Sequence, residues 1–187
     1  KALDDELKQV YLLTQDFIVD CYGLTKNSNR TEGWKSIFRS AENLTEKYER
    51  IKRIEDEITI YYTRLQEQNL DAQHSEELAS GMMKLRATVY AAKYVKDVMH
   101  NIKSMMESEE ALSMEILKRL QGFVGKSLNE LNEFITADNE TKELPAHWEE
   151  RNDTFFRETL ARLYQSIKRE GKNGVPISTM TNVANHT

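Results

Sequence analysis

Apolar residues recur at helical spacing through most of the chain, and this spacing predicts five helices and the start of a sixth. The first predicted helix runs from about Leu3 to Tyr22, and Gly23 is a natural stop for it. The second runs from about Trp34 to Asn69. Ser75 predicts the start of a third helix, whose apolar residues run from Leu78 to Met106. Because its apolar arc is wide, we expect the third helix to contact more than one neighbour.

Polar stretches and prolines divide the rest of the chain. A break near Glu107–Glu110 separates the third helix from a fourth that runs through Leu112–Ile135, although nothing in these residues forces a turn. Pro145 suits the first turn of a fifth helix, which ends at Glu170. Pro176 opens the sixth. The order is therefore three helices, then two and the beginning of a third.

Composition supports an all-α protein. Only 2 prolines and 7 glycines occur among 187 residues, and 39% of the residues are apolar, which is enough to bury a core. The helix order predicts an antiparallel helical bundle made of two tandem three-helix units, residues 1–107 and 108–187, the second with its last helix truncated. Because the chain opens at Lys1 in a helical pattern and stops soon after the start of its sixth helix, we expect a fragment of a longer protein.

Charge and cysteine content exclude several classes of protein. The net charge of −5, with both signs interspersed, disfavours a broad basic surface for nucleic acid. Cys21 is the single cysteine, so an internal disulfide is excluded and a reducing compartment is favoured. No apolar run reaches the roughly 18 residues that cross a bilayer.

One acidic residue occupies a core position on the second predicted helix. Its neighbours at seam spacing are Tyr48, Ile51, Ile58 and Tyr62. Glu55 stands where this series requires an apolar residue, and an unpaired buried carboxylate is strongly unfavourable. Two interpretations follow: Glu55 forms a salt bridge with a neighbouring helix, or it contributes to a metal site or an anion-repelling groove.

The third predicted helix carries a second candidate site. Asp97 and Asn101 lie four residues apart and present oxygen atoms on one face, beside Tyr90 and Tyr94. Oxygen ligands of this kind suit iron, manganese, magnesium or calcium. In the alternative interpretation, the tyrosine hydroxyls and the Asp–Asn pair satisfy one another by hydrogen bonds across helices.

Other combinations of chemical groups give weaker signals. Two acidic pairs share the four-residue spacing, Asp16 with Asp20 and Glu149 with Asp153, and such pairs arise easily by chance on charged helices. The histidines show no ligand spacing, and Cys21 has no identifiable catalytic partner. Neither a phosphate-binding loop nor a nucleotide fingerprint is present. The sequence therefore predicts no enzyme.

The third predicted helix resembles the signature helix of the PhoU fold family, which reads approximately Glu-Arg-Ile-x-Asp-x-x-x-Asn-Ile. The matching residues are Lys93–Ile102, with the sequence Lys-Tyr-Val-Lys-Asp-Val-Met-His-Asn-Ile. The preceding helix, with Ile51, Ile54, Glu55 and Ile58, resembles the partner helix of the same repeat. The resemblance covers about 60 residues, and it implies tandem three-helix bundles.

The end of the chain is similar to the C-terminal PhoU-like region of bacterial sodium/phosphate cotransporters. The matching residues are Arg162–Ile167 with Gly171, and then Ile177–Val183. The resemblance implies a cytoplasmic regulatory domain at the inner membrane that acts in phosphate uptake or its control. Its partners would be the transmembrane portion of the same protein, a second copy in a homodimer, or phosphate-signalling proteins.

The same resemblance implies an alternative function, a carboxylate metal-binding bundle of the PhoU type. Its metal would be iron, manganese or zinc, held by Glu55, Asp97 and Asn101. Metal-binding members of the family carry an acid four residues before the aspartate, and this chain has Lys93 there. Because an ammonium at Lys93 would pair with Asp97 and compete with a cation, we expect no bound metal.

Overall fold

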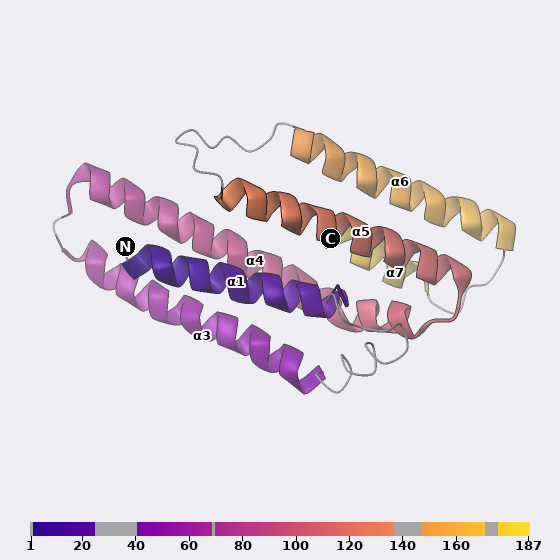
Figure 1. Cartoon of the computed structure of the whole chain (residues 1–187), viewed down its shortest axis with the longest axis horizontal. Helices are drawn as coiled ribbons and strands as arrows, with labels where there is room; N and C mark the ends of the chain where they lie inside the picture. The colour runs from indigo at the N-terminus through magenta and orange to yellow at the C-terminus, as the bar shows by residue number, and fades with distance from the viewer. Residues whose placement is uncertain (1, 25–40, 69, 137–146, 171–175) are drawn as a thin grey trace. The chain divides into compact units, whose positions relative to one another are not determined.

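The computed structural model describes residues 2–24, 41–68, 70–136, 147–170 and 176–187, and in these ranges it is helical without any strand (Figure 1). The helices are α1 (Ala2–Cys21), α3 (Ala41–Gln66), α4 (Ala72–Glu107), α5 (Ala111–Thr136), α6 (His147–Glu170) and α7 (Ile177–Asn185). The predicted all-α helical bundle is therefore confirmed. Among the described residues, every helix is too short or too polar to traverse a bilayer.

The end of α1 follows the prediction made from Gly23. This glycine has a φ of 64°, in the left-handed region that side chains disfavour. Its N–H donates to the carbonyl of Asp20 at 3.1 Å, and the N–H of Leu24 donates to the carbonyl of Val19 at 2.9 Å. These two bonds form a Schellman motif, which satisfies carbonyl groups left free at the helix end.

The start of α4 differs from its prediction by one turn. The helix begins at Ala72, and the side chain of Asp71 caps it by accepting a hydrogen bond from the N–H of His74 at 2.8 Å. Ser75 already lies inside the first turn, where its N–H donates to the Asp71 carbonyl. The predicted start of the preceding helix at Trp34 lies outside the described residues.

The break between α4 and α5 is confirmed. The N–H of Ser108 donates to the carbonyl of Met105 at 3.4 Å, and the Ser108 hydroxyl accepts from the N–H of Glu110 at 3.2 Å. The buried hydroxyl of Ser113 also reaches the Met105 carbonyl, at 3.4 Å. Side-chain oxygens therefore satisfy the polar backbone groups that the missing helical turn would have paired.

The later helix boundaries also agree with the sequence. Helix α6 ends at Glu170 as predicted, whereas Pro145 lies outside the described residues. Pro176 directly precedes α7, and its carbonyl accepts from the N–H of Thr179 at 2.9 Å. The sixth predicted helix is therefore present.

The chain divides into two compact units, Lys1–Asp97 and Val98–Thr187, and the division falls within α4. In the first unit α1 and α3 run side by side (Figure 1). Its core is built from one apolar stripe of each helix: Val10, Phe17 and Cys21 of α1, Ile51 and Ile58 of α3, and Leu85, Val89 and Ala92 of α4. That the two units repeat one three-helix design stays a prediction.

In the second unit α5 packs against α6, and α7 contacts both helices. Its fully buried apolar side chains include Ile116 and Leu120 of α5, Leu163 of α6, and Met180 and Val183 of α7. The short helix α7 therefore contributes to the core of this unit.

Candidate functional site

Glu55 lies in a cluster of charged residues on α3. Its side chain is 18% exposed and forms an ion pair with Lys52, one turn earlier. Burial raises the pKa of the neighbouring Tyr48 hydroxyl; Lys52 opposes this rise, and Asp97 and Glu55 add to it. Glu55 is therefore half-buried and paired, but its partner is on its own helix, whereas the salt-bridge interpretation placed the partner on a neighbouring helix.

The two predicted ligands on α4 have different surroundings. The side chain of Asp97 is 45% exposed, and its Oδ1 lies 3.9 Å from Nζ of Lys96. Lys96, rather than the predicted Lys93, is thus the lysine that contacts Asp97, and its Nζ also lies 5.8 Å from the ring centroid of Tyr48. Asn101 is buried. Asp97 therefore already has a cation beside it.

Glu55 and Asp97 influence the same tyrosine, but they do not assemble a cluster of metal ligands. Throughout the part of the chain that the structure describes, no group of three or more His, Cys, Asp or Glu side chains could hold a metal ion. The metal site at Glu55, Asp97 and Asn101 stays a prediction.

The acidic pair Asp16 and Asp20 on α1 has a structural partner. Lys47 of α3 donates hydrogen bonds to both carboxylates, at 2.6 Å for Asp16. Burial lowers the pKa of Lys47, but the hydrogen bonds to Asp16 and Asp20 outweigh this effect, so the pKa is raised overall. The ion pairs of Lys47 with Asp16 and Asp20 therefore link α3 to α1 at the surface of the first unit.

Cys21 lies next to this ion pair and is unsuited to nucleophilic chemistry. Burial raises the pKa of its thiol to about 12. Asp20 adds to this rise, and Lys47 opposes it. The thiolate is the reactive form of cysteine, and it is negligible at neutral pH with such a pKa. Cys21 is therefore a small apolar core residue.

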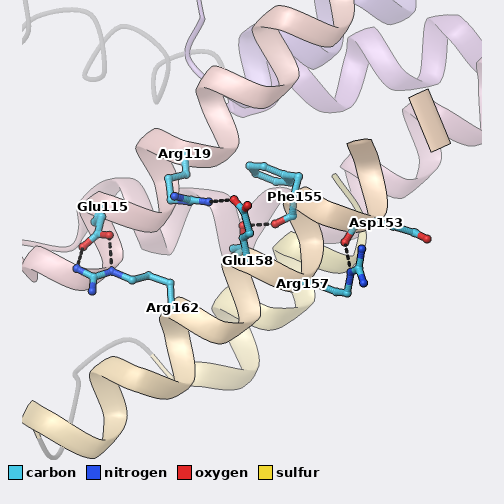
Figure 2. A network of polar contacts seen from close by, with 8 residues as sticks. Glu115, Arg119, Asp153, Phe155, Arg157, Glu158 and Arg162 are labelled. Atoms are coloured by element: carbon cyan, nitrogen blue, oxygen red, sulfur yellow. Dashed lines mark hydrogen bonds and ion pairs between the residues drawn. The ribbon is translucent and has the colours of Figure 1, made fainter. Parts of the chain in front are cut away.

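The second acidic pair is exposed on α6. Glu149 and Asp153 both face solvent, and the backbone carbonyl of Asp153 accepts a hydrogen bond from Nε of Arg157 at 3.3 Å (Figure 2). This bond does not involve the carboxylate. Neither acid adds to a ligand cluster.

The polar network between α5 and α6 was not predicted. Arg162 donates to both carboxylate oxygens of Glu115, at 2.6 and 2.9 Å, and Arg119 donates to Glu158 at 3.2 Å (Figure 2). On each helix a glutamate comes four residues before an arginine: Glu115 and Arg119 on α5, Glu158 and Arg162 on α6. In antiparallel helices this order sets each glutamate opposite an arginine. That matched order was a signal in the sequence.

A further ion pair lies toward the other end of this hairpin. Arg151 of α6 pairs with Glu130 of α5 and also donates to the Ser127 hydroxyl at 3.3 Å. Hydrogen bonding by Arg151 lowers the pKa of the Glu130 carboxyl, as hydrogen bonding by Arg162 lowers that of Glu115. These pairs fix the register of the α5–α6 hairpin.

Helix α4 presents a second, exposed seam opposite the one that it buries. We define the α4 outer face as Met83, Arg86, Tyr90, Lys93, Tyr94 and Asp97, all of which are exposed. These six residues lie within about 100° of one another on a helix of 3.6 residues per turn. Met83 is 71% exposed, Tyr90 54% and Tyr94 51%, and the two tyrosine rings lie 6.5 Å apart. Among the side chains whose burial the structure describes, no other helix exposes three large apolar or aromatic residues.

Comparison with known proteins adds no assignment. No protein-family model, no curated protein and no solved structure matches the sequence. The site therefore has to be interpreted from its own residues.

Proposed function

We propose that this chain is a regulatory and interaction domain of a sodium-dependent phosphate cotransporter, located at the cytoplasmic face of the inner membrane. It acts by binding other protein surfaces and carries no catalysis of its own. The family proposal rests on the resemblance to PhoU-like sequences of three segments: Lys93–Ile102, Arg162–Ile167 with Gly171, and Ile177–Val183.

The observation that carries an interaction role is the α4 outer face. Helix α4 also bears the residues of the resemblance, and it buries one apolar seam while it exposes another that contains Met83, Tyr90 and Tyr94. Grouped exposed apolar and aromatic side chains mark surfaces that bind partners. The carboxylates of Glu55 and Asp97, considered as metal ligands, instead each have a lysine beside them, Lys52 and Lys96.

The test is phosphate uptake in the organism that produces the protein. Deletion of residues 1–187 from the encoded protein is expected to abolish the change in uptake between phosphate-poor and phosphate-rich medium. Replacement of Tyr90 and Tyr94 by alanine should have the same effect without removing the domain. Tyr164→Ala on α6 is the matched control, because Tyr164 is also exposed, at 56%. Unchanged uptake and phosphate response in the deletion strain would refute the proposal.

A further inference from the structure

The α4 outer face carries opposite charges toward its two ends. Arg86 lies near one end and Asp97 at the other, and both side chains are exposed. Eleven positions at 1.5 Å each place them roughly 16 Å apart along the helix axis, so they cannot form an ion pair with each other. Arg86 and Asp97 are therefore not neutralised by each other within one chain, and the cation beside Asp97 is Lys96, whose Nζ lies 3.9 Å from Oδ1 of Asp97.

Such a face is complementary to itself. When two copies of α4 lie antiparallel, the register that sets Arg86 opposite Asp97 of the second copy also sets Tyr90 opposite Lys93. The first contact is an ion pair between opposite charges, and the second places an ammonium beside an aromatic ring. A two-fold axis forms each contact twice, as in most homodimers.

We propose that two copies of the chain pair through the α4 outer face, antiparallel about a two-fold axis, with Arg86 of each copy against Asp97 of the other. This inference rests on the proposed function, because it names the partner that binds the α4 outer face. The contact would join two domains without any change in their cores.

Spacing and charge both favour this partner. Met83, Arg86, Tyr90, Lys93 and Asp97 follow one another at intervals of three and four residues, the spacing of a helix–helix seam. Parallel pairing of two copies would bring Arg86 against Arg86, and like charges at a seam disfavour that orientation. An anionic lipid surface or an acidic segment would meet the carboxylate of Asp97, which repels it.

The experiment is analytical ultracentrifugation of the purified chain at concentrations from about 1 to 100 μM, since one helix face buries a small area and supports weak association. A monomer–dimer equilibrium is expected in this range. Arg86→Asp alone and Asp97→Arg alone should each weaken the dimer about tenfold or more. The double exchange, Arg86→Asp with Asp97→Arg, should restore it, because each new pair again joins opposite charges.

The restored dimer is the decisive result, because the two positions are too far apart to compensate for each other within one chain. Arg53→Asp on α3 is the matched control; it makes the same change of charge at an exposed position off the face and should leave the dimer intact. Far-ultraviolet circular dichroism checks that each variant is folded. A monomer at every concentration would overturn the proposal, and so would a dimer that the double exchange fails to restore.

The two proposals fail separately. A monomeric chain whose Tyr90 and Tyr94 substitutions still alter phosphate uptake would overturn the dimer and leave the regulatory function standing. A dimer that behaves as described, in a protein whose deletion leaves uptake unchanged, would overturn the regulatory function instead.

Discussion

Phe123 of α5 and Phe155 of α6 stack face to face, with ring centroids 4.0 Å apart and an interplanar angle of 12°. The guanidinium of Arg119 lies 5.9 Å from the centroid of Phe155, and that of Arg151 lies 5.6 Å from the centroid of Phe123. Each ring therefore has an aromatic and a cationic neighbour. The stack is the apolar centre of a hairpin whose flanks are ion pairs, and it sets the alignment of the two helices.

Removing one ring of this stack should destabilise the second unit. We expect Phe155→Ala to lower its free energy of unfolding by about 2 kcal/mol, less than for a fully buried phenylalanine because Phe155 is half-buried. Urea unfolding followed by Trp148 fluorescence measures this in a Trp34→Phe background, where Trp148 is the remaining tryptophan. Tyr164→Ala is the control and should change stability by less than about 0.5 kcal/mol. Equal losses for both variants would contradict the role of the stack.

Substitution of Gly23 tests the end of α1. Gly23→Ala should destabilise the first unit by about 1 kcal/mol, because a Cβ atom is unfavourable at a φ of 64°. Gly23→Asn should cost less, since asparagine tolerates the left-handed region better than alanine does. Chemical denaturation followed by circular dichroism compares the two variants. If Gly23→Asn lowers stability as much as Gly23→Ala does, the loss arises from packing and not from backbone conformation.

Local features of the fold were predictable from the sequence. Gly23 marked the end of α1 because the left-handed backbone conformation there depends on that one residue. The Glu107–Glu110 break was predicted although nothing in those residues forces a turn. Glu55 was identified as an acid at a partly buried seam because periodicity reports which side of a helix is covered. The start of α4 was missed by one turn because Asp71 and Ser75 are both good helix caps.

Features that depend on two helices were harder to predict. The Glu115–Arg162 pair requires the register of α5 against α6, which spacing along one helix does not contain. Asp97 and Asn101 share a face by spacing, yet one is exposed and the other buried. The division between the two units falls between these two residues, at Asp97 and Val98.

A metal-binding assay tests the predicted ligands. We expect no stoichiometric metal after incubation of the chain with iron, manganese or zinc, because Lys52 pairs with Glu55 and Lys96 lies beside Asp97. Mass spectrometry of the dialysed protein measures the metal content. One ion per chain that disappears in a Glu55→Ala, Asp97→Ala variant would show instead that these carboxylates form a working site.

Stability of the second unit should depend on acid pH through Glu115. Hydrogen bonding by Arg162, against a smaller opposing effect of burial, lowers the pKa of the Glu115 carboxyl from its ordinary value of 4.5. The unfolded chain therefore takes up this proton more readily than the folded one. The stability that the pair contributes is present above about pH 4.5 and is lost as the pH falls from there through the folded pKa.

Glu115→Gln isolates that contribution. At pH 7 the variant should be less stable than the wild type by less than about 1 kcal/mol, since both side chains of the pair are partly exposed. The difference should shrink as the pH is lowered below about 4.5, because the wild type then loses its ion pair too. Urea unfolding between pH 7 and pH 3 measures both curves, and Glu150→Gln, an exposed acid on α6, is the control. If the difference in free energy of unfolding between Glu115→Gln and the wild type stays constant across this range, the substitution acts through packing and not through the lost charge.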